Sequence, residues 1–262
     1  MGRGTRQNPD SFEFVARFRF HSGLERLLVR GYRSNQIAYP FNEHPGIKDA
    51  IEAMGVPHTE VDVILVNDSS VDFGYQLHDQ DNIEVYPVFS EVPINSPLRL
   101  SPLAPDPVSF VLDVHLGKLA RRMRLLGFDV CYRNDLDDAE IMDIAERENR
   151  IILTRDLGIL KHRKVMCGYL VRSDHLDYQL REVLKRYDLH GRIRLWLRCM
   201  VCNGLMERVN KAEVEPFLEP KTRLYYEDFH RCSNCSRLYW KGSHYDRIDQ
   251  WLNGFMKKVS LL

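Results

Sequence analysis

The chain has 262 residues, 37 of them basic and 37 acidic, and 44% hydrophobic residues. This length favours two or three compact cores, and the balanced charge means that any nucleic-acid site must be local rather than spread over the whole surface. No run approaches the roughly 20 apolar residues of a membrane span, and the N-terminus lacks the apolar run of a signal peptide. We therefore expect a cytoplasmic protein without a membrane partner, in which the six cysteines are metal ligands, core residues or catalysts rather than disulfides.

The first segment, over 11–92, has the pattern of a small α+β domain. Phenylalanines at even spacing over 12–20 predict a strand with one buried face. An amphipathic helix is predicted over 46–54, and further strands over 61–66 and 83–88. Two strands, a helix and more strands, in that order, make a compact roll.

This segment resembles the ubiquitin-like, or β-grasp, domain found in some bacterial proteins. The likeness lies in the order of elements and in the run VDVILVN followed by DNIEVYPVF. The domain has no C-terminal Gly-Gly, because the chain continues into Glu91, Val92 and Pro93. That ending argues against a sulfur-carrier or conjugation role, so we expect a module that docks a protein partner.

A proline-rich stretch over 93–107 separates this domain from the next. Prolines remove backbone donors and fix φ, so the stretch is predicted to be an extended, semi-rigid linker. Five prolines lie within it: Pro93, Pro97, Pro102, Pro105 and Pro107.

The second unit, over 108–190, alternates strand and helix patterns. Repeated βα units predict a parallel sheet with helices on both faces, so the fold class is α/β. The predicted strands cover 109–112, 128–132, 151–153 and 169–171, and the predicted helices cover 116–126, 139–147 and 178–187.

Every predicted strand of this unit is followed by an acid: Asp113, Asp135, Asp156 and Asp174. Ligands of open α/β sheets bind beyond the carboxyl ends of the strands, where these side chains converge. Such carboxylates repel one another unless a cation such as Mg²⁺ or Mn²⁺ neutralises them, and such ions support phosphodiester hydrolysis. The alternative is that each aspartate caps the helix after it.

Asp138 and Glu140 are further candidate ligands, although Asp137 and Glu140 also fit a capping box. The helix after Asp113 is basic, with Lys118, Arg121, Arg122 and Arg124 and no acid between 114 and 128. It is either a phosphate-binding patch or an ordinary solvated surface.

Two Cys-x-x-Cys pairs predict a zinc ribbon over 191–247, followed by a tail over 248–262. Cys199, Cys202, Cys232 and Cys235 supply four thiolates, which complete a tetrahedral structural Zn²⁺ site with no open position. The gap between the pairs leaves room for a helix over 211–218. Basic and aromatic residues around the ribbon either bind single-stranded RNA or, for the aromatics, form its small core: Arg192, Arg194, Trp196, Arg198, Arg208, Lys211, Tyr239 and Trp240.

The stretch FVLDVHLGKLARRMRLLGFDV, followed by YRND, DDAEI and ILTRD, resembles the Mut-seven-C RNase family of PIN-like nucleases. The likeness runs from Phe110 to the C-terminus, and the order of ubiquitin-like domain, PIN-like domain and zinc ribbon is similar to bacterial members. It implies a Mg²⁺-dependent ribonuclease whose acids would be Asp113, Asp135 and Asp156. A receiver-like or nucleotide-binding α/β domain also clusters acids at strand ends, but the sequence contains no Gly-x-Gly-x-x-Gly or P-loop.

The sequence therefore predicts a ribonuclease that hydrolyses RNA phosphodiester bonds at an acidic Mg²⁺ or Mn²⁺ site. The predicted catalytic acids are Asp113, Asp135, Asp138 and Asp156. Lys118 and Arg121 are predicted to contact the RNA backbone, and the zinc ribbon is predicted to aid RNA binding. The alternative is an RNA-binding or ribosome-associated adaptor without catalysis, in which the acids only cap helices.

Overall fold

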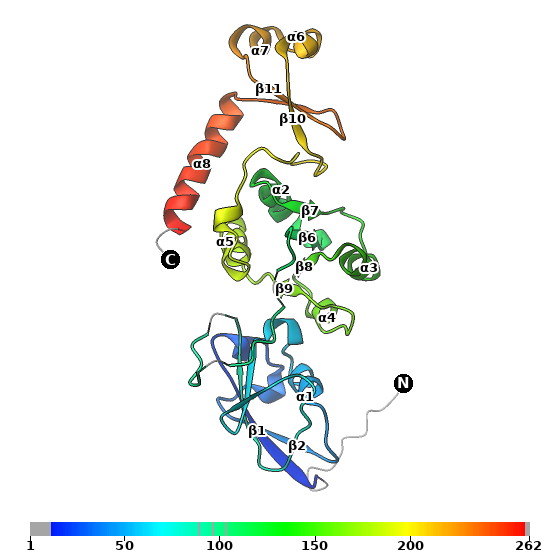
Figure 1. The fold of residues 1–262 in the computed structure, drawn as a ribbon, viewed down its shortest axis with the longest axis vertical. Coiled ribbons are helices and arrows are strands. Elements are labelled where there is room, and N and C mark those ends of the chain that lie inside the picture. Colours follow the sequence, from blue (N-terminus) through cyan, green and yellow to red (C-terminus); the bar gives the residue numbers. More distant parts are fainter. Residues whose placement is uncertain (1–11, 89, 96, 103, 260–262) are drawn as a thin grey trace. The chain divides into compact units, whose positions relative to one another are not determined.

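The computed structural model describes residues 12–259 except 89, 96 and 103 (Figure 1). The described residues form two compact units, one comprising those over 12–102 together with 156–170, the other those over 104–155 together with 171–259. Residue 11 at the start of the predicted β-grasp domain, and 260–262 at the end of the predicted tail, lie outside the described residues. In the described part of the chain, no helix is long and apolar enough to cross a membrane.

The first unit contains a five-stranded mixed sheet in the order β2-β1-β5-β3-β4, which confirms the predicted α+β domain. In this sheet β1 lies between β2, to which it is antiparallel, and β5, to which it is parallel. The strands are β1 (Phe14–Phe20), β2 (Ile37–Phe41), β3 (Val63–Val66), β4 (Ser69–Val71) and β5 (Asn82–Tyr86). The helices before β5 are η2 (Leu24–Leu27), η3 (Arg30–Tyr32), α1 (Ile47–Ala53) and η4 (His58–Glu60).

The core of the first unit explains the sequence pattern of its strands. Phe18 on β1 and Ile51 on α1 are fully buried in one cluster that also takes Ile64 from β3. The other face of β3 is covered too, because Val63 and Leu65 pack with Tyr86 in a second cluster. Strand β3 is buried on both faces, which is why its sequence is a continuous apolar run rather than an alternation.

Part of the proline-rich stretch is bound to the first unit. The Leu100 amide donates to the Asp62 carbonyl at 2.7 Å, and Arg99 Nη1 pairs with Asp62 Oδ2 at 2.6 Å. The first unit also holds a later part of the chain, which contains α4 (Leu157–Leu160) and β9 (Gly168–Leu170).

The second unit contains three parallel strands in the order β7-β6-β8, so β6 pairs with both neighbours. Helix α2 packs against α5, and α3 packs on β6 and β8; Figure 1 shows α5 and α3 on opposite sides of these strands. This arrangement confirms the predicted α/β class. The elements are β6 (Ser109–Leu112), η5 (Val114–Leu116), α2 (Gly117–Leu125), β7 (Asp129–Cys131), α3 (Asp138–Glu148), β8 (Ile151–Thr154), α5 (Leu176–Arg186) and η6 (His190–Arg192).

The rest of the second unit is a three-stranded antiparallel sheet in the order β10-β11-β12, with a helical insertion and a long final helix. Helix α8 spans both sides of the boundary predicted between the ribbon and the tail, and its Trp251 stacks under the Arg122 guanidinium at 3.8 Å from the ring centre. The elements are β10 (Met206–Val209), α6 (Lys211–Val214), η7 (Glu215–Phe217), α7 (Pro220–Tyr225), β11 (Phe229–Cys232), β12 (Leu238–Trp240) and α8 (Ser243–Val259).

Candidate active site and metal centre

Asp113 lies at the carboxyl end of β6 and is fixed by three hydrogen bonds. Its Oδ1 accepts from the His115 amide at 2.8 Å, and its Oδ2 accepts from Thr154 Oγ1 at 2.5 Å and the Arg155 amide at 2.7 Å. The residue is 4% exposed. The first contact caps η5, and the other two connect the ends of β6 and β8. These donors use three of the roughly four acceptor positions of a carboxylate, so Asp113 is a rigid part of the strand ends.

The acids after β7 divide into capping residues and exposed carboxylates. Asp137 caps α3 and forms a full capping box with Glu140, as the sequence pattern suggested. Glu140 also accepts from Arg133 Nη2 at 2.9 Å, while Asp135 accepts from Arg133 Nε at 3.1 Å. Asp138 is the first residue of α3 and is exposed. Of this acidic run, Asp135 and Asp138 are thus the residues that the capping box does not use.

The other two acids at predicted strand ends have different surroundings. Asp156 caps α4 by accepting from the Gly158 amide at 2.6 Å, and it belongs to the first unit. Asp174 is exposed and accepts from Arg155 Nη2 at 2.5 Å. Within the second unit, the described acids do not form a close group of three. The acidic Mg²⁺ or Mn²⁺ site therefore stays a prediction.

The second unit contains a cavity of about 500 Å³. Its lining includes Val114, the residue directly after Asp113. Lys118 and Arg121, three positions apart on α2, both line it, together with His115 and Arg155. The structure thus brings the two predicted backbone-contacting residues to one basic pocket, in which Asp174 is the acid. Sequence reasoning missed His115 and Arg155, although each lies within two residues of a predicted catalytic acid.

Gly117, at the start of α2, is required by the shape of this pocket. A Cβ at this position would lie 2.5 Å from the Tyr132 hydroxyl oxygen. That hydroxyl donates to the Val114 carbonyl at 3.1 Å and lines the same pocket. A side chain at position 117 would displace Tyr132 and so change the pocket wall.

The four predicted zinc ligands come together. The Sγ atoms of Cys199, Cys202, Cys232 and Cys235 all lie within 4.8 Å of one another, and among the described residues this is the group of ligand atoms close enough to hold a metal ion. Burial raises the pKa of the Cys202 thiol, but the Gly204 amide and the neighbouring cysteines outweigh it and lower that pKa to about 6. Four sulfur donors suit Zn²⁺ and leave no position for water, so the donor set fits a structural zinc.

Each Cys-x-x-Cys pair and the turn after it form a zinc knuckle. In the first knuckle, the turn after Cys202 needs a left-handed backbone and a residue without a side chain. Asn203 has φ +69°, in the left-handed region that asparagine tolerates. A Cβ on Gly204 would lie 2.8 Å from Cys232 Sγ and 2.7 Å from Asn234 Cβ. Asn203-Gly204 is therefore the turn that lets the two knuckles approach each other.

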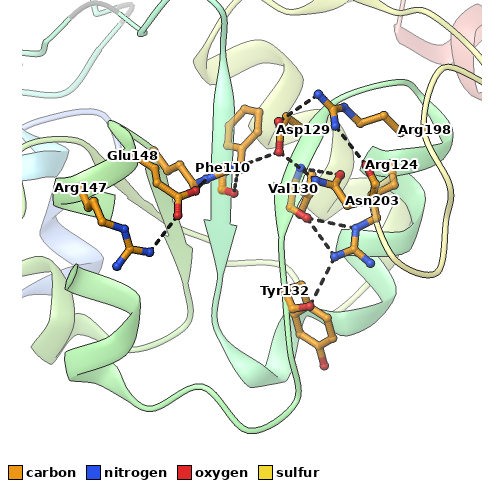
Figure 2. A network of polar contacts seen from close by, with 10 residues as sticks. Phe110, Arg124, Asp129, Val130, Tyr132, Arg147, Glu148, Arg198 and Asn203 are labelled. Atoms are coloured by element: carbon orange, nitrogen blue, oxygen red, sulfur yellow. Dashed lines mark hydrogen bonds and ion pairs between the residues drawn. The ribbon is translucent and has the colours of Figure 1, made fainter. Parts of the chain in front are cut away.

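A buried polar network connects this knuckle to β7 (Figure 2). Arg124 is 4% exposed, and its Nε and Nη2 donate to the Val130 carbonyl at 3.1 and 2.9 Å, while Nη1 donates to the Val201 carbonyl at 2.8 Å. Asn203 Oδ1 accepts from the Val130 amide at 3.0 Å, and its Nδ2 donates to Asp129 Oδ1 at 2.9 Å. The first zinc knuckle is thus fixed to the edge of the parallel sheet.

Asp129 is the anionic centre of the network, as Figure 2 shows. It pairs with Arg150 Nη1 at 2.7 Å and Arg198 Nη2 at 2.9 Å. Burial alone raises the pKa of Asp129, but its contacts with Arg150, Asn203 and Arg198 outweigh burial and lower that pKa from 3.8.

These contacts correct the basic patch suggested by the sequence. Arg124 is buried against carbonyls, so it does not belong to a phosphate-binding surface. Arg122 stacks on Trp251 and does not line the pocket that Lys118 and Arg121 share. In the ribbon, several of the basic and aromatic candidates also have partners within the fold: Arg198 with Asp129, Arg208 with Asp228, Lys211 with Glu227, and Tyr239 with Cys199.

Comparison with known proteins gives two family matches. Residues 108–252 match the family model described as the Mut7-C RNAse domain, and residues 14–93 match the one described as Mut7-C ubiquitin. The first match includes both the basic pocket and the four cysteines. No curated protein and no solved structure matches the chain.

Proposed function

Because the chain belongs to the Mut7-C RNAse domain family, we propose that it is a metal-dependent ribonuclease whose basic pocket takes the RNA backbone beside Asp113. The pocket is the observation that carries this proposal beyond the family. Lys118, Arg121 and Arg155 surround a cavity next to the strand end that carries Asp113. Phosphate oxygens bind basic side chains of this kind, and such contacts set the register of the nucleic acid.

Asp113, Asp135, Asp138 and Asp156 are the proposed ligands of Mg²⁺ or Mn²⁺. Their donor set is all oxygen, which suits a hard cation, and Asp113 supplies a carboxylate whose orientation is already fixed. When bound, the ion would activate the attacking water and stabilise the negative charge that develops on the phosphate. Asp156 is included because of its position in the sequence, directly after the strand pattern IILTR.

The chain's own residues bind and orient the substrate in this proposal. Lys118 and Arg121 lie three positions apart, on one face of α2, and so grip neighbouring phosphate oxygens. Arg155, held by Asp174, offers a further positioned guanidinium. The zinc ribbon is proposed to aid RNA binding indirectly. It fixes β7, and the chain after β7 leads to Tyr132, which lines the basic pocket.

The test is cleavage of a labelled single-stranded RNA with Mg²⁺ or Mn²⁺, with EDTA as the blank. Asp135→Asn and Asp138→Asn remove exposed carboxylates, and each is expected to lower the cleavage rate by about 100-fold or more. The matched control is Asp137→Asn, since asparagine caps a helix as well as aspartate does. Asp113→Asn is less informative because it also disturbs the hydrogen bonds that connect β6 and β8. Cutting that survives EDTA and both variants would contradict the metal-dependent site.

The second candidate is an RNA-binding adaptor without catalysis. The observation in its favour is that Asp113 and Asp156 each cap a helix, which is a complete structural role. This adaptor would bind RNA equally well with and without Mg²⁺, and Asp156→Asn would leave that binding unchanged. Specific RNA binding without any cutting, over several RNAs, would favour it over the nuclease.

The pocket leads to a second prediction, on affinity. Lys118→Gln and Arg121→Gln are each expected to weaken RNA binding for all sequences alike and to reduce the slope of log affinity against log salt by about 1. Fluorescence anisotropy over a salt series measures both effects. Lys185→Gln, an exposed change on α5 outside the pocket, should alter neither. An unchanged salt slope in both pocket variants would exclude phosphate contacts at α2.

A further inference from the structure

The first unit is built from both family-matched parts of the chain. Its five-stranded sheet lies in the ubiquitin match, whereas 156–170 falls inside the RNAse match. This segment begins at Asp156, which caps α4, and ends with β9. The ubiquitin-like fold thus has a partner within its own chain.

Three hydrogen bonds connect the two parts across 107 to 110 sequence positions. Glu60, which is 4% exposed, accepts from the Leu170 amide at 2.8 Å. The His58 Nε2 atom lies 2.9 Å from the Val165 carbonyl oxygen, and Lys161 Nζ donates to the Glu52 carbonyl at 2.9 Å.

The residues that make these contacts are themselves fixed. His58 Nδ1 lies 2.6 Å from Glu52 Oε1, so α1 and η4 hold the ring from one side while Val165 meets it from the other. Val165 and Leu160 are themselves buried. A buried carboxylate such as Glu60 is costly without a partner, which makes its contact with the Leu170 amide a specific attachment.

We propose that the ubiquitin-like domain acts within its own chain as a positioning element of the nuclease, with α1 and η4 holding the 156–170 segment and so fixing Asp156. Glu60 is the main positioning residue. The proposal rests on the proposed function for the role of Asp156, but not for the attachment itself. It gives α1 and η4 a role within this chain, beside the expected docking of a separate protein.

The test compares variants of the full chain in two measurements. Glu60→Ala removes the acceptor, Glu60→Gln keeps an oxygen at nearly the same place, and Lys161→Met removes a different contact while keeping its aliphatic stem. Arg163→Gln, an exposed change on the same segment, is the matched control. The first measurement is amide hydrogen exchange of peptides over 156–170, with peptides over 109–125 as the internal reference. The second is the Mg²⁺ concentration that gives half-maximal cleavage, measured alongside KM for RNA.

We expect Glu60→Ala and Lys161→Met to speed exchange over 156–170 alone and to raise the Mg²⁺ requirement about 10- to 100-fold with KM unchanged. Glu60→Gln and Arg163→Gln should behave as the unmodified protein does. Unchanged exchange in Glu60→Ala would overturn the attachment. Faster exchange with an unchanged Mg²⁺ requirement would overturn the positioning role. If the unmodified protein does not cut RNA, the proposed function fails and exchange alone decides whether the attachment exists.

Discussion

Replacing Cys202 by serine is expected to abolish zinc binding and unfold the ribbon while leaving the sheet of the first unit folded. Structural zinc sites contribute an apparent free energy of about 10–16 kcal/mol, which a three-stranded sheet of this size cannot replace. The ribbon's own core is small, comprising Val214, Leu218 and Phe229 with a few partly buried neighbours. Metal analysis of the purified protein, followed by thermal unfolding, measures the loss.

The control for this prediction is Cys167→Ser, which removes a thiol from the first unit. Cys167 is not among the four clustered sulfurs, so the variant should keep its zinc and the unfolding profile of the ribbon. Full zinc content in Cys202→Ser would show that Cys202 is not a ligand. The loss of zinc should also loosen the edge of the parallel sheet, because Val201 and Asn203 hold Arg124 and the Val130 amide.

Arg124→Ala is expected to lower the free energy of unfolding by about 3–5 kcal/mol, the second large effect. The guanidinium donates to carbonyls of β7 and of the zinc knuckle, and the variant leaves these buried acceptors without a donor. Burial lowers the pKa of Arg124, so the fold holds this cation at a cost that its hydrogen bonds and the nearby cysteines and Asp129 offset in part. Arg124→Lys should recover little of the lost stability, since an ammonium group cannot donate to the Val130 and Val201 carbonyls at once as the forked guanidinium does.

Urea unfolding followed by circular dichroism measures this effect. The matched control is Arg121→Ala, which removes an exposed guanidinium one turn earlier on α2 and should change stability by no more than about 0.5 kcal/mol. Equal stabilities of the two variants would mean that the hydrogen bonds of buried Arg124 add no net stability. A further expectation is weaker zinc retention in Arg124→Ala, because the knuckle loses its anchor on β7.

The elements that could be predicted from the sequence are those with a local periodicity or a fixed spacing. The phenylalanines of β1 are evenly spaced because that strand has one buried face. Strand β3 is a continuous apolar run because both of its faces are buried. The two Cys-x-x-Cys pairs specify a metal centre whatever lies between them. The capping box of α3 is also local, because Asp137 and Glu140 are three positions apart.

What could not be predicted depends on contacts between distant parts of the chain. Arg124 lies in a basic run, and nothing in its neighbours distinguishes it from exposed Arg121. Its partners are backbone carbonyls, which no side-chain pattern reveals. Glu60 and Leu170 are a similar case, being 110 positions apart. His115 and Arg155 join the pocket only because β6 and β8 end side by side, which is a property of the sheet.

The discontinuity of the first unit sets an order for its assembly on the ribosome. Its N-terminal sheet is synthesised first, and at about 5–20 residues per second the chain from residue 93 to residue 170 follows about 4 to 15 s later. During that interval Glu60 and His58 have not yet met Leu170 and Val165. The N-terminal domain is therefore placed to serve as a template on which the later segment folds, and a nascent chain stalled before residue 170 would expose that template to chaperones.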